Sequence, residues 1–517
     1  MIKATIAQLR LAWERYKRDL KDRSFVDHRV LETLIEQDLS SWLQDIQRKL
    51  EDGYNPQPSR SCSVPKPGFM IRPGMTLEPA DAVVYTFLVG QIFPLLQTEC
   101  RGTDGTIDIA YRLSSKSNSK EWTSHDFKVW RQWREKSLRS LKRNVEYVVT
   151  TDITGYYDNI PIDKLASELR RIGAPGEVVS LLQRCLQRWS HPRNEGIPQG
   201  YTTSDLLAKL YLTPVDKHLQ RDGFSHLRYV DDIRIFCSTK LQAKHAIRQL
   251  SALTYFRGLT LQSAKTDILT KAEARTEFDG VTEIINGINA KLAEELGDLI
   301  GSGYASPAEL IELLGDREGP TPPVLERAFT EHFGVGSTED FNATLFHYLL
   351  VRLGKAGSCI AVAYCIQTLS ARPEETGQIL SYFSQIELGP AEVRSVIEYM
   401  ASNDAIYDYQ LYQLLRWFYN RQIKDDQLLQ LSRQWSRDRN RDHWLRSYAI
   451  AYRGQHGDET DLDELENDYN SSESELQKCD CVLALRGVEK GRRNAFYARV
   501  ENEGILVSRA VRLAKQS

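Results

Sequence analysis

The chain has 517 residues, of which 41% are hydrophobic, 26% charged and 9% aromatic. This composition supports a folded core and excludes disordered and collagen-like chains. With 67 basic and 70 acidic residues the net charge is −3, so no overall positive field draws the molecule to nucleic acid or to a membrane. Any surface that binds nucleic acid must therefore be local.

Targeting signals and cysteine usage favour a cytoplasmic protein. The N-terminus alternates charges where a signal peptide would be apolar. The longest apolar run, residues 82–96, is interrupted by polar residues and is shorter than the roughly 20 residues of a membrane-spanning helix. We therefore expect a buried core helix there and no membrane association. Eight scattered cysteines form no CxxC pair, which argues against a disulfide framework and a zinc site.

The chain divides into three regions. The first region, residues 1–70, is expected to contain N-terminal helices and an extended linker. The Gly-, Pro- and Ser-rich composition that indicates the linker runs from residue 52 to residue 79, past this boundary. Residues 71–285 mix β-rich runs with helical segments, as is typical of an α+β domain. We expect strands over 146–151, 225–238 and 259–269, and helices over 162–172, 176–189 and 240–257.

Helical periodicity dominates residues 286–517, with segments such as 306–314, 341–353, 373–385, 391–400 and 407–419. This pattern predicts an all-α domain of stacked helical hairpins. No fixed repeat period is present, so a HEAT-like stack is a hypothesis about shape. Residues 458–475 contain nine acids and no Lys or Arg, which predicts a solvated loop.

Three acids are candidates for a catalytic site. Asp152 follows the β-type run 147–149, and a carboxylate at the end of a strand emerges beside a cleft. Asp231 and Asp232 lie in the middle of a β-rich stretch, where a hairpin turn would expose both. Buried without partners, they would be costly. Carboxylates that converge from separate strands suit a pair of Mg²⁺ ions, or Mn²⁺ in their place, because Mg²⁺ prefers oxygen ligands and keeps positions for phosphates.

Phosphoryl transfer at a two-metal site follows from such a set of acids. We expect Asp152 and Asp231 to be the principal ligands, Ile153 to offer its backbone carbonyl, and Asp232 to support them. One ion would lower the pKa of the attacking hydroxyl, and the other would neutralise the triphosphate and the leaving pyrophosphate.

Two further segments are candidates for nucleotide binding. Gln199 and Gly200 lie in a Gly/Pro turn before a helix, where the backbone comes close to a base and a sugar. Lys265 follows the acids on a strand or turn near the expected triphosphate, where its ammonium would protonate or stabilise pyrophosphate.

A basic stretch precedes the first acid: residues 111–147 hold ten Lys or Arg against four acids, with three interleaved tryptophans. This composition is that of a surface that tracks phosphates and stacks bases. Arg112 is its candidate triphosphate contact. An amphipathic helix whose tryptophans face the core explains residues 126–143 equally well.

These motifs, in this order, resemble the fingers and palm of right-hand reverse transcriptases over roughly residues 70–285. Asp152 with Tyr157 resembles motif A. Motif B is matched by residues 198–200, motif C by residues 229–232 and motif D by residues 258–265. The resemblance implies that Tyr157 selects deoxynucleotides by blocking a 2′-hydroxyl and that Gln199 lies against the incoming nucleotide. Residues 201–205 depart from the small residues and proline of templated enzymes, which predicts unusual handling of template or primer.

A palm joined to more than 200 helical residues resembles the abortive-infection (Abi) reverse transcriptases of bacteria and prophages. The resemblance implies a homo-oligomer in phage defence that joins dNTPs into single-stranded DNA without a template, uses a protein tyrosine as primer, and has a phage component as candidate partner. Tyr54 and Tyr304 lie in Gly-containing loops suited to priming. Two alternatives are a templated enzyme, retron-like or group II-like, and a binding scaffold with a relic palm, against which the intact acids, Tyr157 and Lys265 argue.

Overall fold

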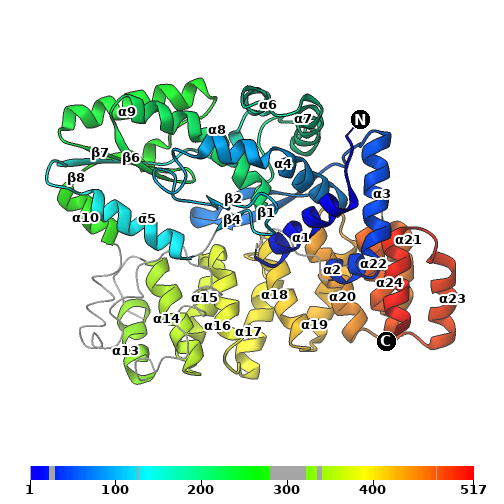
Figure 1. The fold of residues 1–517 in the computed structure, drawn as a ribbon. Coiled ribbons are helices and arrows are strands. Elements are labelled where there is room, and N and C mark those ends of the chain that lie inside the picture. The colour runs from blue at the N-terminus through cyan, green and yellow to red at the C-terminus, as the bar shows by residue number, and fades with distance from the viewer. Residues whose placement is uncertain are drawn as a thin grey trace.

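The computed structural model describes residues 2–22, 30–124, 127–279, 322–334, 341–472 and 474–516. A body of strands and helices, here called the sheet domain (residues 54–279), faces a row of helices, here called the helical array (residues 322–516, less the gaps above) (Figure 1). Three N-terminal helices lie at one end of the molecule, where the two bodies meet: α1 (Ile6–Asp22), α2 (Leu31–Glu36) and α3 (Leu39–Asp52).

The segment expected to be an extended linker contains a β-hairpin. β1 (Arg60–Lys66) and β2 (Met70–Thr76) pair antiparallel around a single 3₁₀ turn, η1 (Pro67–Phe69). The proline-based prediction of a linker is wrong here because a two-stranded ribbon has free edges, where a residue without an N–H breaks no ladder. The domain boundary expected at residue 70 falls inside this hairpin, and the one at residue 285 lies outside the described residues.

A four-stranded antiparallel sheet in the order β6-β7-β5-β8 forms the centre of the sheet domain. Its strands are β5 (Tyr147–Thr151), β6 (Ser225–Tyr229), β7 (Asp232–Cys237) and β8 (Asp267–Thr270). The last strand is shorter than expected. Leu261 and Gln262 pair with the chain just after β5, and the 3₁₀ turn η3 (Ser263–Lys265) precedes β8.

Side chains that alternate along the strands bury both faces of this sheet. Val149 and Ile235 join the main core beneath α8 (Thr202–Arg221) and α9 (Lys240–Phe256). The neighbouring Val148 and Phe236 join a second cluster on the opposite face. That face is covered by α5 (Phe127–Ser140) and α10 (Lys271–Asp279) (Figure 1).

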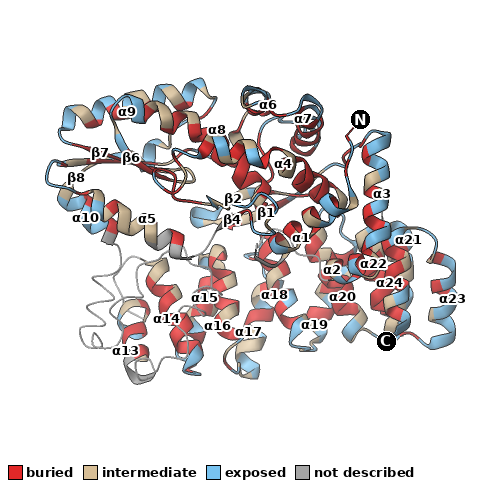
Figure 2. Ribbon diagram, in the orientation of Figure 1, coloured by how far each residue is buried: buried red, intermediate tan, exposed pale blue. Residues whose placement is uncertain are grey.

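The remaining elements of the sheet domain surround this core. They are α4 (Pro79–Cys100), β3 (Arg112–Leu113), β4 (Thr123–Ser124), η2 (Tyr157–Asn159), α6 (Ile162–Arg171) and α7 (Gly176–Ser190). In the described part of the chain, α4 alone has the length and apolar composition of a membrane-crossing helix, but 72% of its most apolar window is buried. It packs against α1, α7 and α8, so the expectation of a core helix is confirmed (Figure 2).

The helical array has two rows. Even-numbered helices from α14 to α24 pack side by side in order, and α15, α17 and α19 pack on one another in the second row. The expected helical domain is confirmed, while its HEAT-like character stays a prediction and residues 306–314 lie outside the described residues. The bounds are α13 (Pro322–Phe333), α14 (Ala343–Lys355), α15 (Val362–Ala371), η4 (Pro373–Glu375), α16 (Thr376–Phe383), α17 (Pro390–Ala401), α18 (Asp408–Asn420), α19 (Asp426–Arg437), α20 (His443–His456), α21 (Glu459–Ser471), α22 (Glu475–Ala484), η5 (Leu485–Gly487), α23 (Lys490–Val500) and α24 (Ile505–Gln516).

Most of the acidic run 458–475 is helix α21, so the prediction of a solvated loop is wrong. Asp458 caps this helix through the backbone N–H of Asp461. The carboxylate of Asp461 is fully buried and accepts hydrogen bonds from Arg433 and Arg453. Arginines on neighbouring helices thus supply the positive charge that residues 458–475 lack.

Candidate active site

Asp152 leaves the end of β5 at the edge of the sheet. Its backbone carbonyl accepts a hydrogen bond of 2.8 Å from the Gln262 N–H, which fixes the chain at this point. One carboxylate oxygen accepts a hydrogen bond of 2.5 Å from the Lys265 ammonium. The other, Oδ1, is buried without a hydrogen-bond partner, so the site holds an acceptor with unused capacity.

Asp231 and Asp232 lie at the turn that joins β6 to β7, as the sequence predicts. β7 pairs directly with β5, and Ile233 lies opposite Thr151. This register brings the turn beside Asp152. Burial, then Asp152, then Asp232 raise the pKa of Asp231 to about 7. Burial and Asp152 likewise raise the pKa of Asp232 to about 6. The three carboxylates are therefore close enough to repel one another.

This arrangement fits a divalent cation. Repelling, partly buried carboxylates favour a bound cation, because the cation removes the cost of holding them ionised. The buried Oδ1 of Asp152 is an oxygen acceptor of the kind that Mg²⁺ prefers. In the described part of the chain no three His, Cys, Asp or Glu side chains form a complete ligand group, and the Lys265 ammonium, not a third carboxylate, lies against Asp152.

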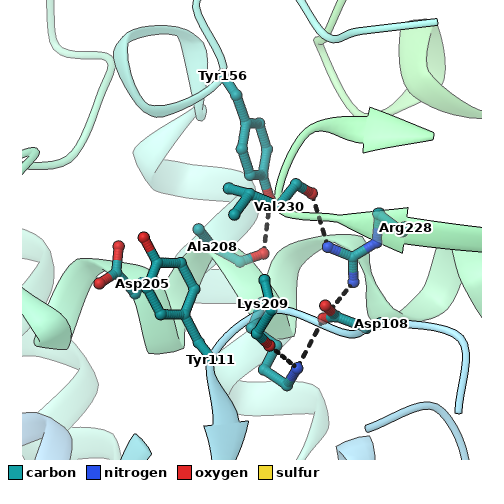
Figure 3. A pocket seen from close by; sticks show the side chains of 9 residues that line it. Asp108, Tyr111, Tyr156, Asp205, Ala208, Lys209, Arg228 and Val230 are labelled. Atoms are coloured by element: carbon teal, nitrogen blue, oxygen red, sulfur yellow. Dashed lines mark hydrogen bonds and ion pairs between the residues drawn. The ribbon is translucent and has the colours of Figure 1, made fainter. Parts of the chain in front are cut away.

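Arg228 holds the turn that carries the acids. Val230 has a φ of 58°, a left-handed conformation that is unfavourable for a β-branched residue. Its carbonyl accepts a hydrogen bond of 2.8 Å from Arg228, which lies two residues earlier on β6 (Figure 3). The guanidinium is fixed by ion pairs of 2.7 Å with each of Asp108 and Asp216, all three side chains being almost completely buried. Buried charges in this network are paired, so it forms a rigid base for the turn.

Lys209 extends this network toward a small cavity. Its ammonium lies 2.9 Å from Asp104 and from Asp108, and donates to the Ala110 carbonyl. The cavity, of about 10 Å³, is lined by Lys209, Arg228, Val230 and neighbouring side chains (Figure 3). Its size is at the lower limit for one water molecule, so it is no nucleotide site.

The loop that contains Gln199 and Gly200 is tied to the segment after Asp152. Gly196 has a φ of 89°, and a Cβ there would lie 2.9 Å from the Asp158 carbonyl, so only glycine fits. The next N–H, of Ile197, donates to the Tyr157 carbonyl. Gln199 is half-buried and Gly200 is buried. Nucleotide contact by these two residues stays a prediction.

The residues after Gly200 are built into the N-terminal helices. Tyr201 is buried, and its hydroxyl accepts a hydrogen bond from the Leu77 N–H. Asp19 of α1 accepts from both the N–H and the hydroxyl of Thr202, and so caps α8 from another helix. Tyr201, the residue before α8, makes no capping hydrogen bond through its own side chain. The unusual sequence of this loop therefore serves its packing against α1.

Tyr157 is buried to 7% exposure, and its hydroxyl donates a hydrogen bond of 2.6 Å to Asp205. Asp205 lies in the first turn of α8, and its buried carboxylate fixes the orientation of the tyrosine ring. Burial and the Asp205 charge raise the pKa of Tyr157 well above its ordinary value, so its hydroxyl stays protonated. Selection of deoxynucleotides by this ring stays a prediction.

Two cations on the hairpin are not among the site residues predicted from the sequence. Lys66 and Arg72 share one face of the β1–β2 ribbon. Burial lowers the pKa of Lys66, the positive Arg72 lowers it further, and the charges of Asp158 and Asp231 raise it. Lys66 therefore lies within electrostatic range of Asp231. The prolines of residues 52–79 indicated a linker, so no local signal placed these cations near the site.

The triphosphate contact predicted for Arg112 stays a prediction. The Arg112 guanidinium packs against Gly105, where a Cβ would collide with it, and beside Lys136. Trp122 and Trp133 are buried, so the core-facing interpretation holds for them and the base-stacking one is wrong. The chain at Ile153 pairs with Leu261, and its carbonyl as a ligand stays a prediction.

A family model covers the part of the chain that contains this site. Residues 93–293 match the family model described as reverse transcriptase (RNA-dependent DNA polymerase), and this range contains all three acids and Lys265. No curated protein matches the chain. Among solved structures, a telomerase from Candida albicans in complex with the TWJ fragment of telomeric RNA has 13% identity and a TM-score of 0.33, over 71% of this chain and 70% of that chain. Residues 93–293 thus carry a reverse transcriptase domain, and the protein is a nucleotidyltransferase of the reverse transcriptase and DNA polymerase class.

Proposed function

We propose that this protein is a Mg²⁺-dependent DNA polymerase of the abortive-infection type, which acts in bacterial defence against phage. The observation that carries the polymerase activity is the repelling carboxylate cluster beside Lys265. Asp152 and Asp231 would hold the ions, with Asp232 and the Ile153 carbonyl beside them. The bound ions supply charge neutralisation for the triphosphate and a lowered pKa for the attacking hydroxyl.

The chain's own residues orient the reactants. Lys66 and Arg72 bind the triphosphate. Both cations lie on one face of the hairpin and interact electrostatically with Asp158, and Lys66 also interacts with Asp231. Lys265, held at Asp152, donates a proton to the leaving pyrophosphate. Gln199 lies against the base of the incoming nucleotide.

The untemplated, protein-primed mode is supported by the loop after Gly200 and by the helical array. Tyr201 and Thr202 are fixed to the N-terminal region, so this loop differs from that of templated enzymes in more than composition. Tyr54 does not fit the role of primer, because it is buried and its hydroxyl donates a hydrogen bond of 2.7 Å to Asp81. Tyr304 lies outside the described residues. Among the described tyrosines, only Tyr255, at 80% exposure, is fully accessible, and it is the first to test.

The test is to incubate purified protein with Mg²⁺ and labelled dNTPs in the absence of template and primer. Asp231→Asn and the exposed Asp163→Asn serve as the inactivating variant and its matched control. Labelled product that shifts on protease treatment, persists in the control and vanishes in Asp231→Asn is the expected result. Tyr255→Phe shows whether that residue carries the label.

A templated reverse transcriptase, retron-like or group II-like, is the second candidate, favoured by the family description as an RNA-dependent DNA polymerase. Label that appears only with a primed RNA or DNA template would establish it and contradict the untemplated mode. No label under either condition would contradict the polymerase itself. The defence role predicts that bacteria expressing the wild type, but not Asp231→Asn, resist phage in a plaque assay.

A further inference from the structure

The β1–β2 hairpin belongs to the sheet domain by sequence, yet its tip is bonded to the helical array. The hydroxyl of Tyr407, the residue before α18, donates a hydrogen bond of 2.7 Å to the backbone carbonyl of Phe69. Strand β1 packs against α18 and η4, and the hairpin turn also packs against η4. These contacts join residues more than 300 positions apart in the chain.

The same contact supports an unfavourable backbone conformation. Gly68 and Phe69 have φ values of 77° and 58°, so two successive residues are left-handed at the tip. Glycine adopts such angles freely, but an aromatic residue does so rarely. The Phe69 side chain is 60% exposed and contributes little packing of its own. The Tyr407 hydrogen bond therefore lies at the residue where the turn most needs support.

Two further contacts fix the base of the hairpin to the array. Cys62, at 1% exposure, is part of the hydrophobic core of the array, and Val64 packs against it. The backbone N–H of Ser63 donates to the carboxylate of Asp442 at the start of α20. The tip and base of the ribbon are thus both held by helices that lie outside residues 93–293, the range that matches the reverse transcriptase family.

We propose that the helical array completes the nucleotide site, with Tyr407 as a positioning residue that holds the hairpin turn between Lys66 and Arg72. This inference rests on the proposed role of these two cations in triphosphate binding. The turn at residues 67–69 lies between Lys66 and Arg72 in the chain, so a change in its conformation moves one cation relative to the other. Loss of the Tyr407 hydroxyl should weaken nucleotide binding without altering the acids.

Tyr407→Phe tests this directly, because it removes one hydrogen bond and keeps the ring. Under conditions in which the wild type incorporates nucleotide, we expect KM for dNTP to rise about fivefold, the effect of one lost hydrogen bond, with kcat nearly unchanged. The matched control is Tyr399→Phe, whose hydroxyl donates to Leu369 and Gln410 within the array. An unchanged KM in Tyr407→Phe, or an equal rise in both variants, would overturn the inference.

Hydrogen exchange of residues 60–76 gives a second readout that needs no activity. We expect faster exchange of the hairpin in Tyr407→Phe and no change in Tyr399→Phe. Unaltered exchange in both variants overturns the anchoring role, even if KM rises. A wild type that incorporates no nucleotide under any condition would instead contradict the proposed function, so the two failures are distinguishable.

Discussion

Two acidic clusters in this chain differ in what their carboxylates contact. In α21, Asp461 is fully buried, yet hydrogen bonds from Arg433 and Arg453 overcome the effect of burial and hold its pKa below the ordinary value. At the β6–β7 turn, burial and the charge of Asp152 raise the pKa of Asp231 to about 7. The first cluster is neutralised by its surroundings, and the second keeps an excess of negative charge.

The number of acids does not distinguish the two regions. Residues 458–475 contain nine acids, whereas the strand end and the turn contribute three. What differs is the balance of charge, because Lys265 and Arg234 offset the catalytic acids only in part. Repelling acids held by a rigid network, here that of Arg228, indicate a site built for a cation.

The sharpest way to separate the clusters is to neutralise the acid in the turn. Asp231→Asn should lower nucleotide incorporation by about 10³-fold, since it removes a main electrostatic group. In the wild type the pKa of Asp231 is raised in the folded state, so the folded protein binds more protons than the unfolded one. The wild type therefore loses stability as pH rises from about 4 to 7. A neutral amide should therefore leave stability at pH 8 unchanged or higher in the absence of metal. A melting experiment beside the activity assay checks both, and a destabilised variant would contradict the account.

The corresponding change in α21 should act on folding instead. Asp461→Asn leaves Arg433 and Arg453 without their shared carboxylate, and we expect a loss of about 3 kcal/mol in the free energy of unfolding. Incorporation per folded molecule should stay close to that of the wild type. Urea denaturation, with activity measured well below the transition, tests this. Lost activity in fully folded protein would show that the two clusters are not separate.

Arg228→Lys tests whether the buried network positions the catalytic turn. Lysine keeps the charge near Asp108 and Asp216 but lacks the planar fork that also reaches the Val230 carbonyl. Small displacements of catalytic groups are costly, so we expect kcat to fall about 10²-fold with KM for dNTP little changed. His226→Gln is the control, because His226 contacts Asp216 but not the turn. Equal effects of the two substitutions would show a general loss of packing.

The smallest expected effect concerns the hairpin cations. Lys66→Ala or Arg72→Ala should raise KM for dNTP about tenfold, the effect of one lost charge-assisted hydrogen bond, and leave kcat nearly unchanged. Arg112→Ala is the comparison variant, since Arg112 packs against Gly105. Steady-state kinetics at varied dNTP concentration distinguish these effects. A larger rise of KM in Arg112→Ala would favour Arg112, as predicted from the sequence, over the hairpin cations as the triphosphate contact.

Much of the fold and the acids of the site follow from local sequence. The helices expected at 162–172, 176–189 and 240–257 match the structure to within one residue, because their apolar spacing and breaking residues are local signals. The placement of the acids at a strand end and a hairpin turn is local in the same sense. Their mutual repulsion follows from the pairing of β5 with β7, which the order of the motifs suggested.

What sequence reasoning missed depends on contacts between distant segments. Lys66 comes within electrostatic range of Asp231 in a segment that forms a hairpin, whereas the prolines of that segment suggested a linker. Tyr54 lies in a sequence typical of a loop but is buried against Asp81. The negative charge of α21 is balanced by arginines from α19 and α20, which the local sequence of the acidic run does not reveal. Each of these errors comes from a partner more than 20 residues away or from another helix.

Calorimetric titration of the protein with Mg²⁺ at pH 7, in buffers of different ionisation enthalpy, tests the central claim most directly. Burial and the charge of Asp152 raise the pKa of Asp231 to about 7, so a bound cation must displace protons from this side chain at neutral pH. We predict that Mg²⁺ binds with release of protons and that binding tightens as pH rises toward 8. Asp231→Asn should lose that binding, and Asp461→Asn should keep it. Absence of Mg²⁺ binding in the wild type, or unchanged binding in Asp231→Asn, would contradict the claim that the repelling acids form the cation site.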